Sequence, residues 1–230
     1  MIEDTDFETF LYISDNKYQI FVYDKNNSKN LYNEEIKNDN EIELNILSKF
    51  LDDNIYKIEK IIKNFIKNII LIIEDDKVLE IGLSIKIKNY EKQLDYKYVK
   101  NGLIEAKNIF KENYPDLVMM HMLIVDNDMS KKLLSNSKKI NDNYLYLEVN
   151  FICISVSYTH ILDKLLGNLQ ITIEQYMSGN YVKNFLEEDE NMIPVIANKL
   201  NNGFNINEVK VISKNKENIG FFERFFQLFS

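Results

Sequence analysis

The side chains that could catalyse a reaction or bind a metal are few in this sequence and lie far apart. His121 and His160 each lack a second His, Cys or carboxylate at the spacing that metal ligands need. Cys153 is the single cysteine, which excludes an internal disulfide framework or a thiolate cluster. The carboxylates of residues 187–190 are consecutive, as in a charged loop, and do not resemble a pair flanking a scissile bond. We therefore expect no enzymatic site and no metal.

The surroundings of these residues favour structural roles. His121 and Cys153 both lie inside apolar runs, so we expect them in the core. His160 follows Ser157 and Thr159, whose hydroxyls suit the start of a helix. The chain's 6 glycines are isolated, and none forms a phosphate-binding loop such as G-x-G-x-x-G. We therefore expect no nucleotide and no other cofactor.

Residues 219–230 offer a different chemistry, which is insertion into a lipid surface. On a helix, their apolar side chains fall within one arc of about 160°, opposite Glu223 and Gln227. The segment is shorter than the roughly 20 apolar residues that span a bilayer. It therefore predicts a helix that lies in the headgroup region. The predicted membrane-binding residues are Phe221, Phe222, Phe225, Phe226, Leu228, Phe229, Arg224 and Lys216.

The alternative for this tail is a C-terminal helix that packs on the protein's own core. Residues 201–218 favour the membrane interpretation because they are rich in Asn, Lys and Glu and predict a flexible polar tether. The formal charge of −8 argues against nucleic-acid binding, which depends on clustered Lys and Arg. The acidic residues at the N-terminus do not resemble a signal peptide. We therefore expect a cytoplasmic protein, peripheral on the inner face of the cell membrane.

The remaining sequence predicts alternating strands and helices. A β-hairpin is expected over residues 10–23, followed by a polar loop over 24–40. Helical spacing covers residues 41–68, with a break expected at 52–54. Further on, strands are expected at 69–73, 78–87, 117–125, 145–156 and 170–176, and helices at 96–113, 161–169, 181–186 and 192–200.

Several stretches, taken in this order, resemble the first half of FtsA, the bacterial actin-like protein that attaches the FtsZ ring to the membrane. Residues 79–84 (LEIGLS) are similar to the family's V-x-V-G-I-S-G strand, and residues 98–107 to the helix that opens its small inserted subdomain. Residues 120–126 are similar to that subdomain's H-x-[IL]-P strand, and 145–185 to its later strand, helix and return strand. The phenylalanine tail is similar to the family's membrane-targeting helix.

The resemblance implies an α+β fold, made of a partial actin-like (ribonuclease H-like) domain, the small inserted subdomain and a C-terminal amphipathic helix. It implies four segments: 1–90, part of the first actin-like domain; 91–186, the inserted subdomain and return strand; 187–216, a short helix and tether; and 217–230, the membrane helix. The family's nucleotide site opens with D-I-G-T-S-K. Here Tyr12 stands in place of its aspartate and Ser14 in place of its glycine.

The function implied is that of a cell-division adaptor that links division proteins to the membrane without ATP. Its implied partners are the membrane surface, FtsZ or other division proteins, and further copies of itself. The second hypothesis is a peripheral scaffold or pilus-assembly protein of the actin-like type, unrelated to division. The third is a small enzyme, which the lack of a converging nucleophile, base or metal set disfavours.

Overall fold

The computed structural model describes residues 7–38, 43–88, 96–125, 144–186 and 192–210. These residues form two compact units. The first contains Met1–Val78 and Ser157–Phe204, and the second contains Leu79–Val156 and the chain from Asn205 onward. The second unit is therefore inserted into the first. The boundaries of the two units differ from the expected segments 1–90 and 91–186. The reason is strand pairing: residues 79–88 pair with 144–155, whereas residues 172–178 return to the first sheet.

The first unit is built on a five-stranded sheet with the order β3-β2-β1-β4-β8. The strands are β1 (Phe7–Ser14), β2 (Lys17–Asp24), β3 (Lys29–Lys37), β4 (Asn68–Glu74) and β8 (Thr172–Ser178). β2 pairs antiparallel with both β1 and β3, whereas β4 pairs parallel with both β1 and β8. The carboxyl ends of β1, β4 and β8 therefore meet at one edge of the sheet, where ligands of open α/β sheets usually bind.

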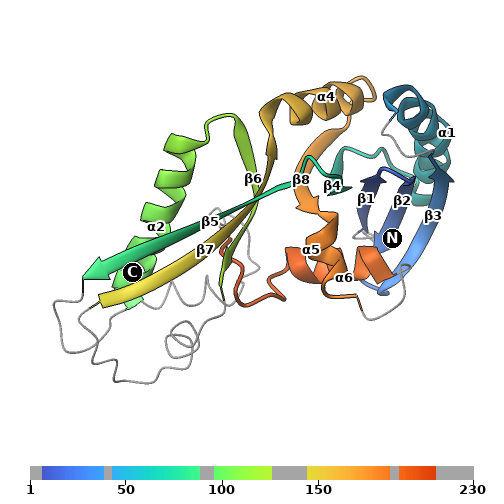
Figure 1. The fold of residues 1–230 in the computed structure, drawn as a ribbon. Helices are drawn as coiled ribbons and strands as arrows, with labels where there is room; N and C mark the ends of the chain where they lie inside the picture. Colours follow the sequence, from blue (N-terminus) through green and yellow to red (C-terminus); the bar gives the residue numbers. More distant parts are fainter. Residues whose placement is uncertain (1–6, 39–42, 89–95, 126–143, 187–191, 211–230) are drawn as a thin grey trace. The chain divides into compact units, whose positions relative to one another are not determined.

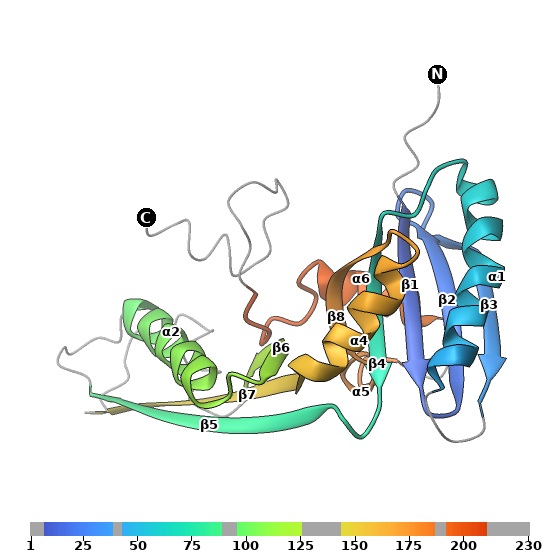
Figure 2. The same ribbon diagram turned by 90° about the horizontal axis from the view of Figure 1, so that it is seen from above.

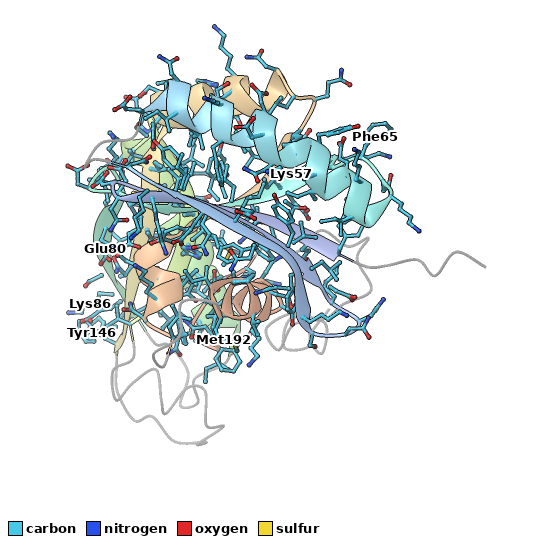
Figure 3. The ribbon with its side chains drawn as sticks, turned by 90° about the vertical axis from the view of Figure 1, so that its right-hand side faces the viewer. Lys57, Phe65, Glu80, Lys86, Tyr146 and Met192 are labelled. Carbon is cyan, nitrogen blue, oxygen red and sulfur yellow. The ribbon has the colours of Figure 1, made fainter. Side chains whose placement is uncertain are left out.

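Helices cover both faces of this sheet, with α1 and α4 on one face and α5 and α6 on the other (Figures 1 and 3). The helices are α1 (Leu44–Ile62), α4 (Val156–Gly167), α5 (Gly179–Lys183) and α6 (Ile193–Asn201). β1 and β4 lie in the interior of the sheet, with helices on both of its faces. Both strands are therefore mostly apolar and buried. The helix predicted to begin near His160 begins earlier, at Val156, so Ser157 and Thr159 lie inside it.

The predicted hairpin is confirmed, but the polar loop predicted after it is wrong. Residues 29–37 form β3, an edge strand whose side chains are mostly exposed or half-buried. An edge strand needs few apolar residues, so it lacks the alternation that marks a half-buried strand. β3 is instead held in place by its backbone pairing with β2 and by a 2.9 Å hydrogen bond from Gln19 Nε2 to Asn33 Oδ1.

The break predicted at residues 52–54 does not occur, and α1 runs through them. Asn54 is buried in the helix, where its Nδ2 donates to the carbonyl of Phe50 at 2.7 Å and its Oδ1 accepts from Tyr32 of β3 at 2.5 Å. The side-chain amide of Asn54 therefore forms hydrogen bonds through both its nitrogen and its oxygen inside the helix. The helix ends earlier than predicted because Lys63 takes a left-handed conformation, with φ 54°.

The second unit consists of one helix packed on a three-stranded antiparallel sheet with the order β5-β7-β6. Its elements are β5 (Leu79–Lys88), α2 (Tyr96–Asn113), β6 (Leu117–Ile124) and β7 (Tyr144–Ser155), all close to the predicted ranges. Figure 2 shows α2 along one face of this sheet. The core between them includes Phe110 stacked on Phe151, and Cys153, which confirms the predicted core role of the cysteine.

The first part of the predicted tether is not a free linker. The backbone N–H of Val209 donates to the carbonyl of Met122, and that of Ile124 donates to the carbonyl of Asn207, both at 2.8 Å. Residues 205–210 therefore line the outer side of β6. His121 is buried in the same place, with Nδ1 2.8 Å from a carboxylate oxygen of Glu208. The core role predicted for His121 is confirmed, although its partner comes from a segment that the sequence alone marked as linker.

The predicted membrane helix, residues 217–230, lies outside the described residues, and so do residues 187–190 and 211–216. Within the part of the chain that the structure describes, no helix has the length and apolar character needed to cross a bilayer.

Candidate functional site

The candidate site is the edge of the first sheet at which β1, β4 and β8 end. Tyr12 and Ser14, which the sequence resemblance aligned with a nucleotide-binding aspartate and glycine, both lie here at the end of β1. Their register partners on β4 are Ile72 and Glu74. The structure therefore brings a tyrosine, a serine and a carboxylate together at the position where a related fold would receive phosphate.

Glu74 is held from two sides. The Tyr12 hydroxyl donates a short hydrogen bond to Glu74 Oε2, and the Lys183 ammonium lies 2.8 Å from the same oxygen. Lys183 reaches the carboxylate because α5 begins directly against β4. A Cβ on Gly179, the first residue of α5, would lie only 2.6 Å from Glu74 Cβ and 3.2 Å from its Cα. Gly179 therefore allows the close approach that places Lys183, four residues later, on Glu74.

The ring of Tyr12 is buried between cations. It is 1% exposed, with the Lys17 and Lys183 ammonium groups 5.5 and 5.6 Å from the ring centroid. Both distances are within the range in which a cation is attracted to an aromatic face. The tyrosine thus fills the space beside Glu74 and engages two of the lysines that a phosphate would need at this edge.

Ser14 closes the β1–β2 turn with its own side chain. Its hydroxyl lies 2.7 Å from Asn16 Oδ1 and accepts the backbone N–H of Lys17 at 3.2 Å. A phosphate-binding turn instead points its backbone N–H groups at the anion and needs glycine to let the anion approach. In this chain the serine hydroxyl takes the N–H of Lys17, as in a Ser/Thr turn.

A second carboxylate, Asp75, follows Glu74 and is also paired. Its Oδ2 lies 3.0 Å from Lys77 Nζ and 3.4 Å from the Tyr158 hydroxyl, and its Oδ1 accepts the Lys77 backbone N–H at 2.9 Å. Burial would raise the pKa of Asp75, but the hydrogen bonds from Asp76 and Lys77 outweigh burial and lower it. Burial is the main cause that raises the pKa of the Tyr158 hydroxyl, and the negative charge of Asp75 raises it further. The hydroxyl therefore stays protonated.

Taken together, this edge is a set of mutually satisfied charges. Glu74 and Asp75 each have a lysine and a tyrosine hydroxyl as partners. Among the described residues, no group of three or more His, Cys, Asp or Glu is arranged to hold a metal ion. The arrangement stabilises the junction of the three strands and α5, and a phosphate entering it would meet two carboxylates.

Sequence reasoning located Tyr12 and Ser14 but missed Glu74, Asp75 and Lys183, because it left residues 74–77 as the connection between two predicted strands. The available signal was a run of three carboxylates, Glu74, Asp75 and Asp76, at the end of an apolar strand. His121 and His160 belong to different units. The predicted membrane-binding residues, Phe221 to Phe229 with Arg224 and Lys216, lie outside the described residues.

Comparison with known proteins gives structural neighbours only. No family model matches the sequence, and no curated protein matches it. A chain of the "PilM-PilN type IV pilus biogenesis complex" matches with a TM-score of 0.50 and 8% identity, over 86% of this chain. The described core shares that chain's fold. At this identity, the similarity shows the fold alone.

Two further neighbours match with lower scores. One is the cytoplasmic domain of EpsL, an inner-membrane component of the type II secretion system of Vibrio cholerae, with a TM-score of 0.38, 6% identity and 75% of this chain covered. The other is a Bacteroides thetaiotaomicron protein described as having an actin-like ATPase fold and unknown function, with a TM-score of 0.32, 14% identity and 80% covered.

Of the three neighbours, the Bacteroides protein is the one described as having an actin-like ATPase fold. Nothing in them is specific to FtsA or to division, so that narrower expectation has no support from these matches. The chain spans 57%, 53% and 58% of the lengths of the EpsL, PilM–PilN and Bacteroides chains.

Proposed function

We propose that this protein is a non-enzymatic scaffold of the actin-like type, which binds protein partners at the inner face of the membrane and is attached there by its C-terminal helix. The observation that carries the proposal is the closed edge of the first sheet. There the buried Tyr12 and the Glu74–Lys183 pair lie at the strand ends, where the resemblance to the actin-like family would imply a phosphate site.

The membrane part of the proposal rests on the sequence of the tail. The apolar arc of residues 221–229 has the width and length of an interfacial helix. A single short helix binds lipid weakly, so attachment to a multi-subunit assembly would strengthen it through effective concentration. The neighbours PilM–PilN and EpsL, described as parts of a pilus biogenesis complex and of an inner-membrane secretion system, support a role in such an assembly.

A division adaptor of the FtsA type is the second candidate. It is favoured by the similarity of the phenylalanine tail to that family's membrane helix and by the order of the inserted strands. The two candidates differ in their protein partner. Binding of purified FtsZ to the full chain favours the division adaptor, whereas its absence favours the pilus or secretion type of scaffold.

The experiment that tests the proposal compares the full chain with a chain lacking residues 217–230 in liposome flotation. We expect the full chain to float with anionic vesicles and the truncated chain to stay at the bottom, with its thermal unfolding unchanged. If the truncated chain unfolds, or binds a dye that reports exposed apolar surface, the tail belongs to the core and the proposed attachment is wrong.

A further inference from the structure

Among the described residues of the second unit, one edge of the sheet has no paired strand. Its strand order is β5-β7-β6, and residues 205–210 lie along the outer side of β6. β5 is 10 residues long, and no strand among the described residues pairs with its outer side. An unpaired edge of this length presents a row of backbone donors and acceptors that can bind another strand.

The backbone groups on the outer side belong to the even-numbered residues of β5. The N–H of Val125 donates to the carbonyl of Glu148, so the even residues of β7 bond toward β6 and the odd ones toward β5. In the β5–β7 register, the odd residue Val149 pairs with Leu83. Leu83 and its odd neighbours therefore bond to β7, and Gly82 and Ser84 direct their N–H and C=O groups outward.

The side chains of β5 divide between the two faces in the same way. The exposed face carries Glu80 near the start of the strand and Lys86 near its end. Figure 3 shows both on one side of the molecule with Tyr146. Neighbours on β7 hold the two charges there, since Asn150 Nδ2 donates to Glu80 at 3.0 Å and Lys86 Nζ lies 4.1 Å from the Tyr144 ring centroid.

The face toward α2 is apolar and incompletely covered at this edge. Ile85 is buried, but Ile81 and Leu83 are only partly buried although they pack on the core of the unit. Gly82 lies between them with open space around the position of a Cβ, and its pairing with Asn150 is regular. The fold of the unit does not require this glycine. An interior strand glycine without a bulge is typical of a close approach by another backbone.

We infer that the occupant of this edge is the β5 strand of a second copy, paired antiparallel about a two-fold axis through Leu83. This register places Glu80 opposite Lys86 of the second copy, twice by symmetry, and Gly82 opposite Ser84. On the other face it places Ile81 opposite Ile85, so the partly buried apolar side chains cover one another. The result is a continuous sheet through two copies, with an isologous interface.

The inference deepens the binding of protein partners that the proposed function includes, since it names a second copy as one such partner, and it rests on the proposed function in that respect. Charged residues on an edge strand can also act to prevent pairing. If the charges on β5 prevent pairing, a charge needs no opposite charge at the position related to it by the two-fold axis. If they stabilise the dimer, Glu80 and Lys86 must face each other across that axis. Swapping charges therefore separates the two interpretations.

The first test uses disulfide trapping of the full chain in the absence of lipid. Leu83→Cys places two thiols on the axis, in a non-hydrogen-bonded pair with Cα atoms about 4.5 Å apart, which suits a disulfide. Ser84→Cys is the matched control, since its two copies lie about 7–8 Å apart in this register. The native Cys153 is buried. We expect a covalent dimer for Leu83→Cys only; a dimer for Ser84→Cys alone, or for neither, overturns the inference.

The second test measures dimer dissociation by analytical ultracentrifugation, again without lipid. Glu80→Lys and Lys86→Glu should each weaken the dimer by about tenfold or more, and the double swap should restore it, because opposite charges then face each other again. Lys88→Glu changes the net charge equally but has no symmetry-related glutamate, so it should have little effect. A native chain that stays monomeric at high concentration, or a double swap without rescue, overturns the inference and leaves the membrane and nucleotide parts of the proposal unaffected.

Discussion

Replacing Phe222 or Phe226 with glutamate is expected to abolish flotation of the full chain with anionic liposomes. Both residues belong to the apolar arc of the tail. Burial of a phenylalanine side chain contributes about 1.5–3 kcal/mol, and a charge in its place opposes insertion, so partition should fall by about a hundredfold or more. Since a single short helix binds only marginally, this loss leaves no measurable attachment.

Lys216→Ala is the matched control for the membrane prediction. Lys216 precedes the apolar arc, so its attraction to anionic lipid adds about 1 kcal/mol near the surface and is screened by salt. We expect this variant to float slightly less well than the native chain and to depend less on ionic strength, because it has lost one charge that attracts anionic lipid. Equal loss of flotation for Lys216→Ala and Phe222→Glu would contradict a hydrophobic anchor.

The second large effect is expected at Tyr12. Tyr12→Asp should lower the free energy of unfolding by about 4 kcal/mol, because it removes a buried ring and puts a second carboxylate beside Glu74. Chemical denaturation with two spectroscopic probes measures this change. The substitution introduces the aspartate of the motif that the sequence resembles, yet it should not create a nucleotide site even when combined with Ser14→Gly.

Tyr12→Phe separates the packing of the ring from the hydrogen bond of the hydroxyl. It keeps the ring and removes only the donor to Glu74, whose carboxylate still has Lys183 as a partner. The expected cost is about 1–2 kcal/mol, less than half of that for Tyr12→Asp. If Tyr12→Asp is as stable as the native chain, this edge is solvated and open, and the closed-site interpretation is wrong.

Most of the fold could be predicted from apolar periodicity. The hairpin, the buried strand β4 and the helix α2 have strong local patterns and occur as predicted. The edge strand β3 could not be recognised, because its stability comes from pairing with β2 and not from its own side chains. The helix break at residues 52–54 was wrongly predicted for a similar reason, since the use of Asn54 inside α1 depends on Tyr32 of another element.

The candidate site was predictable only in part. Tyr12 and Ser14 could be placed because the resemblance to a known motif marked them at the end of a strand. The contact of Glu74 with Lys183 depends on the parallel register of β4 and β8 and on the approach of α5 at Gly179, and these are tertiary facts. The pairing of His121 with Glu208 likewise joins residues 87 positions apart.

The central proposal is that this chain works by binding, without nucleotide. Thermal unfolding of the full chain with millimolar ATP and Mg²⁺, against Mg²⁺ alone, tests it most directly. We predict no shift of Tm, because the strand edge is filled by Tyr12 and the paired Glu74. A ligand that stabilises the native state by about 1 kcal/mol would raise the Tm of a chain of this size by about 2–4 °C, and such a rise with ATP would contradict the claim.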